Sequence, residues 1–191
     1  MHERYAYRSF RLRPRSWPKL VEHVRARARA PYGLFSGQIG LGANEGVLIE
    51  VGEGAATALD GCDAVLESRG ERLVATVRPR DPAPPTLPGV YAHRWFELLE
   101  SDWPEFLELS EGAWPAFESD YDAQIQGFWR SLDVAPPRAR VLLLTRYASL
   151  AEWERSRTPI SDATHEAGRR FRRRHELTAD TRVVTTERRL L

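Results

Sequence analysis

Cysteine and long apolar runs are nearly missing from this chain of 191 residues. Its one cysteine, Cys62, cannot close an intrachain disulfide, so a reducing compartment is the default expectation. The longest uninterrupted apolar run, residues 141–144, is far too short to cross a bilayer, and the first ten residues lack an apolar signal core. We therefore expect a soluble cytoplasmic protein with no membrane partner.

An excess of charge of one sign is also missing. The sequence has 28 basic and 27 acidic residues, a net charge of +1, which gives no global field to attract nucleic acid. The basic run RRFRRRHE at 169–176 has no aromatic series around it on which bases could stack, so we interpret it as a solvated helix end. No nucleic-acid partner is expected.

Motifs for common cofactors are absent as well. The sequence has no Walker loop, no G-x-S-x-G elbow and no Cys/His cluster with the spacing of a zinc site. The glycine-rich stretch GQIGLGANEG falls in an expected hairpin rather than between a strand and a helix. We expect no metal site and no resident cofactor, with haem as the one open alternative.

What the sequence does contain is an internal repeat. YAYRSFRLRPRSWPKL, at 5–20, returns as YAHRWFELLESDWPEF at 91–106. Over 5–22 and 91–108, eight of the 18 aligned pairs are identical, far more than unrelated segments would share. Duplication of one structural unit explains this pattern.

A proline-rich segment separates the two copies. RDPAPPTLPG, at 80–89, has four prolines that favour an extended spacer over a folded element. The boundaries we predict are one repeat over 4–80, a linker over 81–89 and a second repeat over 90–191.

Each copy shows the same order of expected elements. In the first, alternating apolar residues predict strands at 5–12, 33–41, 46–52 and 72–79, with a helix beginning near residue 17 and another over 54–70. In the second, the order is a strand at 91–98, a helix after 102, strands at 125–129 and 140–147, a helical stretch over 149–176 split at Pro159, and a strand at 181–190.

This order is βαββαβ twice, which predicts an α+β fold of two tandem ferredoxin-like units. Each sheet would carry both helices on one face and leave the other face uncovered. Two such sheets in one chain can cover each other. We therefore expect them to pack sheet to sheet as a pseudo-dimeric α/β barrel within the chain.

Comparison of the two first strands predicts which side chains face the space between the sheets. The even-numbered face, beginning at Ala6 and Ala92, is identical in both copies, as expected for packing against helices. The other face has diverged, which predicts that Tyr7, His93 and Trp95 point between the sheets. The candidate ligand-binding residues are Tyr7, Tyr91, His93, Trp95, Trp129 and Tyr147. These aromatic side chains suit either an apolar pocket or a filled core, and the sequence leaves both open.

His93 is the candidate catalytic residue. On the inferred inter-sheet face, its imidazole could act as a general base or bind haem iron. A histidine that is only hydrogen-bonded within the interface is the alternative. His165, in the last helical region, is a second candidate haem ligand.

Several motifs resemble the NIPSNAP family: RSFRLRPRSWPKL, HRWFELLESDWPEFLELSEGAWPAFE, VLLLTRYASLAEWERSR and the terminal ERRLL. The resemblance is best over 91–191. It implies a member of the dimeric α/β-barrel superfamily, and it implies no agreed enzymatic activity for the family and no catalytic motif for this chain. Related barrels include cofactor-free monooxygenases, haem-degrading enzymes and cyclases.

Two functions remain open at this point. The first is binding, without turnover, of a small apolar or aromatic molecule, or of a protein partner, at the inter-sheet barrel. The second is a small barrel oxygenase, cofactor-free or haem-binding, that uses His93. Residues 1–30 carry a net charge of +7 and residues 97–122 a net charge of −9, so a homo-oligomer joined by these segments is also possible.

Overall fold

The computed structural model describes residues 3–27, 31–52 and 57–191. The first half of the chain forms β1 (Arg4–Leu12), α1 (Trp17–Arg25), β2 (Gly33–Ile39), β3 (Glu45–Val51) and β4 (Val65–Arg78). The second half forms β5 (Val90–Leu99), a 3-10 turn (Glu100–Asp102), α2 (Trp103–Asp120), β6 (Ala123–Ser131), β7 (Arg138–Tyr147), α3 (Leu150–Arg155), α4 (Asp162–Glu176) and β8 (Thr178–Arg188).

The strands close into one barrel, in the order β1-β3-β2-β8-β5-β7-β6-β4. Each half contributes four neighbouring strands in the ferredoxin-like order, β4-β1-β3-β2 and β8-β5-β7-β6. The halves join where β2 pairs with β8 and where β4 pairs with β6, both antiparallel. Closure leaves none of the described strands with a free edge. The fold is thus the predicted pair of tandem units closed into an intrachain barrel.

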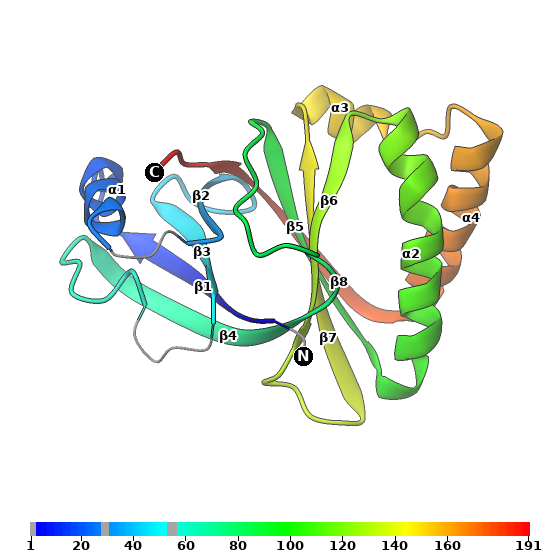
Figure 1. The fold of residues 1–191 in the computed structure, drawn as a ribbon, viewed down its shortest axis with the longest axis horizontal. Coiled ribbons are helices and arrows are strands. Elements are labelled where there is room, and N and C mark those ends of the chain that lie inside the picture. Colours follow the sequence, from blue (N-terminus) through cyan, green and yellow to red (C-terminus); the bar gives the residue numbers. More distant parts are fainter. Residues whose placement is uncertain (1–2, 28–30, 53–56) are drawn as a thin grey trace.

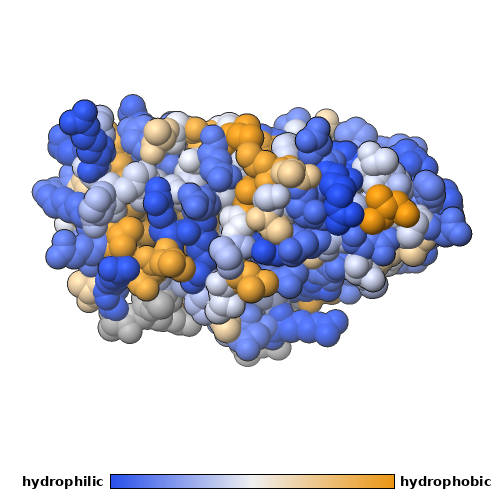
Figure 2. All heavy atoms as spheres, turned by 90° about the horizontal axis from the view of Figure 1, so that it is seen from above, coloured by the Kyte–Doolittle hydropathy of each residue, from blue (hydrophilic) through white to orange (hydrophobic). Residues whose placement is uncertain are grey.

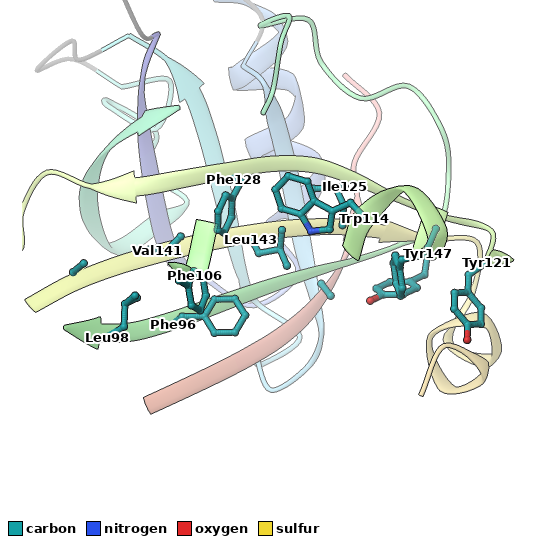
Figure 3. Close-up of a cluster of buried hydrophobic side chains, with 14 residues drawn as sticks. Phe96, Leu98, Phe106, Trp114, Tyr121, Ile125, Phe128, Val141, Leu143 and Tyr147 are labelled. Carbon is teal, nitrogen blue, oxygen red and sulfur yellow. The ribbon is translucent and has the colours of Figure 1, made fainter. Parts of the chain in front are cut away.

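The two faces of the ring bury different cores, as the strand alternation predicts. Phe10 and Leu12 of β1 pack outward with Leu20 and Val24 of α1. In the second half, the outward side chains pack under α2 and α4. Figure 3 shows the buried side chains of this cluster. The third core fills the barrel interior and includes Tyr7, which alternates with the outward side chains of β1.

The predicted helix over 54–70 is wrong. Residues 57–64 form turns and Val65 begins β4; residues 54–56 lie outside the described residues. The Glu50 carboxylate accepts hydrogen bonds from the Thr57 hydroxyl at 2.7 Å and from the Ala58 backbone N–H at 3.0 Å, which fixes the turn. Gly61 has a φ of +74°, a value that glycine adopts readily. The segment that looked helical instead extends β4 to 14 residues, most of them paired with β1.

The helices are distributed unevenly around the ring. Figure 1 shows α2 and α4 side by side over the sheet of the second half, with α1 alone at the opposite end of the molecule. The acidic α2 meets the basic α4 directly, because Arg173 Nε lies 2.7 Å from Glu105 Oε1. Part of the charge asymmetry is therefore neutralised within the chain, and a homo-oligomer stays a prediction.

Among the described residues, none of the helices has the length and apolarity needed to cross a membrane. In Figure 2, hydrophobic residues form small separate patches among hydrophilic ones on the face shown. Barrel closure accounts for this, since the large apolar faces of the strands point inward or under helices.

Candidate functional site

Five of the six predicted ligand-binding residues lie inside the barrel. Tyr7, Tyr91, Trp95, Trp129 and His93 are all buried there, with the first four part of one apolar cluster. Their rings pack against one another and against neighbours, as in the edge contact between Tyr7 and Trp95, whose centroids lie 5.2 Å apart. The predicted facing of Tyr7, His93 and Trp95 is confirmed. Much of the interior is filled by these side chains.

The contacts of His93 are satisfied by the tautomer that carries its proton on Nε2. In that arrangement the Thr186 hydroxyl donates its single proton to the carbonyl oxygen of Tyr91, at 3.2 Å. His93 Nε2, 3.0 Å from the same hydroxyl oxygen, then donates to it. His93 Nδ1 is then a bare acceptor, buried and without a hydrogen-bond partner.

The environment of His93 disfavours its charged form. The side chain is 0% exposed. Its ring meets those of Phe35 and Tyr7, at centroid distances of 5.0 and 5.8 Å. Burial lowers the pKa of His93 from 6.5 to about 3. The imidazole is therefore neutral at physiological pH and weakly basic.

A haem does not fit His93 in this arrangement. Axial ligation needs a ring nitrogen that faces open space, but Nε2 is bonded to Thr186 and Nδ1 is enclosed. His165, the other candidate, is exposed on α4. Among the described residues, no three His, Cys, Asp or Glu side chains gather as a metal site.

A cavity of about 590 Å³ opens at one mouth of the barrel, with His93, Tyr7 and Trp95 among its lining residues. Part of its charged wall is paired within the protein. Arg140 Nη1 lies 3.2 Å from Glu71 Oε2, and the Arg140 guanidinium stacks over Trp95 at 4.4 Å. Burial raises the pKa of Glu71. The mouth is thus roomy and mixed in charge. Arg11 pairs with Glu67 there, whereas among the described residues no carboxylate lies within 4.0 Å of Arg69 or Arg182.

The prediction that Tyr147 lines the inter-sheet space is wrong. Leu142 and Leu144 of β7 point into the barrel, so the alternating residues Leu143, Thr145 and Tyr147 point toward the helices. The Tyr147 ring packs edge-on against Phe117 of α2, with centroids 6.1 Å apart. The apolar run at 141–144 hid the alternation, because both of its faces are buried.

Tyr147 instead lines a second pocket, which lies between the sheet of the second half and its helices. This helix-covered pocket has a volume of about 240 Å³. Figure 3 shows the Trp114 ring beside Ile125 and Leu143, with Phe96 and Tyr147 to either side. The lining comprises Ala92, Arg94, Phe96, Trp114, Phe117, Ile125, Leu143, Thr145, Tyr147, Ser156, Arg157, Phe171, Arg174 and His175.

Three arginines give the helix-covered pocket its charge. Arg174 of α4 is only 8% exposed; Arg94 of β5 is partly buried, and Arg157 is exposed at the edge. Burial, with the neighbouring cation Arg94, lowers the pKa of Arg174 to about 9. Burial, with the charge of Arg157, likewise lowers the pKa of Arg94. The electrostatic field inside this pocket is positive.

Sequence reasoning missed both inner arginines. Arg94 matches Arg8 in the repeat, and the repeat predicts that this face packs under the helices. Arg174 belongs to the basic run at 169–176, whose position predicts a solvated helix end. The available signal was helical spacing: Phe171 and Arg174 lie three residues apart and so share the face that α4 turns to the sheet.

Comparison with known proteins gives matches in structure alone. No family model matches the chain, and no curated protein matches its sequence. A proposed monooxygenase from Lactobacillus acidophilus NCFM superposes with a TM-score of 0.64 at 11% identity, covering 98% of this chain and 94% of that one. An anthrone oxidase-like protein gives 0.61 at 10% identity, covering 100% and 92%. A proposed chlorite dismutase, TA0507, gives 0.55 at 11% identity, covering 100% and 96%.

The chain has the dimeric α/β-barrel fold. Superposition over nearly the whole chain, together with the closed ring of two ferredoxin-like sheets, decides this. At these identities the likeness concerns the fold alone. Membership of the NIPSNAP family is not supported by any of the matches and stays a prediction.

Proposed function

We propose that this α/β-barrel protein binds a small apolar or aromatic molecule in the helix-covered pocket. The observation that carries the proposal is a cavity of about 240 Å³ walled by aromatic side chains, among them Phe96, Trp114 and Phe171. Pockets for small molecules are mostly apolar with a few polar groups that orient the ligand, and this lining has that composition. Well-packed cores rarely leave voids much larger than a water molecule.

The ligand class is the one expected from the sequence, but the location differs. The inter-sheet barrel is occupied over much of its length by the rings of residues such as Tyr5, Tyr91 and Trp129. Its open mouth is lined by charged groups of both signs, of which Glu71 and Arg140 pair with each other. Ligand binding at the inter-sheet space stays a prediction, and the helix-covered pocket is the better supported site.

A neutral aromatic probe tests the proposal. Titration with 1-naphthamide, followed by calorimetry and by tryptophan fluorescence, is expected to give saturable binding, because Trp114 lines the pocket. Ala92→Leu extends a buried alanine into the cavity and is expected to abolish binding while the protein stays folded. Ala151→Leu, on exposed α3, is the matched control and keeps it. Equal binding by Ala92→Leu and the parent protein would place the ligand elsewhere.

Oxygenation of the bound molecule is the second candidate function. It is supported by the fold neighbours described as monooxygenases or as anthrone oxidase-like, which match this chain over nearly its full length. The reaction would take place in the helix-covered pocket, where His175 is the imidazole on the wall. The test is oxygen uptake with an electron-rich phenol, compared between the parent protein and Ala92→Leu. Uptake that is the same in both would reject this site.

His93 has a different place in the proposal. Its enclosed nitrogens and low pKa suit a structural hydrogen bond to Thr186 better than proton transfer to a ligand. The oxygenase role of His93 stays a prediction. It would be supported if His93→Phe removed oxygen uptake without lowering stability at neutral pH.

A further inference from the structure

We propose that the molecule bound in the helix-covered pocket is a carboxylate with an aromatic body, and that Arg94 and Arg174 hold its carboxylate group. This inference rests on the proposed function and specifies the chemistry of its ligand. It is carried by two inward-facing guanidinium groups that lack an anionic partner, and by a third unpaired donor on the same wall.

The charge balance of the pocket is the first argument. Across residues 3–27, 31–52 and 57–191, no carboxylate lies within 4.0 Å of the guanidinium nitrogens of Arg94, Arg157 or Arg174. The charged group that most affects the pKa of Arg174 is Arg94, and the charged group that most affects the pKa of Arg94 is Arg157. Each cation therefore destabilises the next. Removing charges from water without an opposite charge is costly, and an anionic ligand would offset that cost.

Other arginines around the same core show that the chain usually provides a partner. Arg78, which stacks over Trp114, lies 2.5 Å from Glu118 Oε1. Arg130, on β6, stacks over Trp103 and is paired with Glu100. The second half therefore neutralises arginines that enter its core, and Arg94 and Arg174 are departures from that pattern. An exogenous anion explains the departure.

The hydrogen-bonding groups on the wall are the second argument. Arg174 Nη1 donates to the Ser110 hydroxyl at 3.2 Å, which uses one of its five N–H groups. The Trp114 indole N–H is buried without an acceptor, and Figure 3 shows the nitrogen on the edge of the ring nearest Leu143, another lining residue. The wall thus presents an excess of donors. A ligand group that only accepts, such as a carboxylate, satisfies them.

The aromatic surroundings of Arg174 favour a planar carboxylate over a phosphate. Its guanidinium carbon lies 4.9 Å from the centroid of Phe96 and 4.8 Å from that of Phe171, so aromatic rings pack against the group. The planar guanidinium suits the two parallel hydrogen bonds of a carboxylate. The apolar walls, with Phe117 and Leu143, then accommodate the aromatic body. A dianionic phosphate would be poorly solvated against them.

Two isosteric probes test the assignment. The parent protein is titrated with 1-naphthoate and with neutral 1-naphthamide at the same ionic strength. We expect the carboxylate to bind at least tenfold more tightly, a preference of about 1.4 kcal/mol. Arg94→Met and Arg174→Met are expected to reduce that preference to less than threefold. Arg172→Met, an exposed position on the same helix, is the matched control and keeps the full preference.

Each outcome separates this inference from the proposed function. If both probes bind equally to the parent protein, the pocket stands and the carboxylate assignment is wrong. If neither binds, the proposed function itself fails. If inorganic phosphate displaces 1-naphthoate at equal concentration, the occupant is a different anion. Circular dichroism shows whether Arg94→Met and Arg174→Met are folded. Normal binding of 1-naphthamide by either variant shows in addition that the pocket itself is intact.

Discussion

Lowering the pH is expected to destabilise the barrel through His93. In the unfolded chain its pKa is 6.5, and burial lowers the folded value to about 3. Between these two values the unfolded state binds more protons than the folded state, so the free energy of unfolding falls as the pH falls. The stability conferred by a neutral His93 is fully present above pH 6.5 and is lost between about pH 6.5 and pH 3.

The magnitude follows from the two pKa values. The linkage relation gives a loss of about 2 kcal/mol between pH 7 and pH 5, and about 3 kcal/mol by pH 4. The value at pH 5 depends little on the folded pKa, because any folded pKa below about 4 leaves the native imidazole unprotonated there. Burial, rather than an ion pair, is the cause, and the added proton on Nδ1 would find no acceptor.

The assay is chemical denaturation at pH 7 and pH 5, at constant ionic strength, for the parent protein and for His93→Phe. Phenylalanine keeps a planar ring in the core, and Thr186 keeps its bond to the Tyr91 carbonyl. Other groups titrate in both proteins, so the difference between the two declines isolates His93. We expect the parent protein to lose about 2 kcal/mol more than the variant.

A second substitution serves as the control. His165→Gln changes an exposed histidine on α4 and is expected to leave the decline of the parent protein in place. An equal decline for His93→Phe and the parent protein would refute the reasoning. It would mean that water reaches the imidazole, or that Nδ1 has an acceptor when protonated.

Three further outcomes follow from burial and charge. Arg94→Met should raise the free energy of unfolding without ligand by about 1 kcal/mol or more, because it removes an unpaired cation, and a loss of stability would contradict this. Trp129→Ala should lower the free energy of unfolding at pH 7, measured by chemical denaturation, by about 3–5 kcal/mol, because the indole is fully buried inside the barrel. A loss below about 1 kcal/mol would show that the surrounding side chains collapse into the space or that water fills it. A double-mutant cycle on Arg173 and Glu105 should give about 0.2–1 kcal/mol that falls with salt, because both side chains are about half exposed, and a salt-independent value would mean that the pair is shielded from solvent.

The repeat explains why so much of the fold follows from the sequence. Because the face of β1 that packs on a helix is repeated identically in β5, the facing of Tyr7 and His93 could be predicted from local alternation alone. The segment over 54–70 was mispredicted because its composition suits a helix, whereas pairing of β4 with β1 made an extended strand more favourable.

The sequence by itself determined the βαββ succession with which each half begins, the closing strand of each half, and the inward position of His93, because these depend on periodicity along a single strand or helix. Only the tertiary structure decided that the barrel interior is largely filled, that Tyr147 belongs to the helix-covered pocket, and that Arg94 and Arg174 meet there without a carboxylate. Those features depend on which side chains from β5, β7, α2 and α4 come together, and on how much of the space between them they fill.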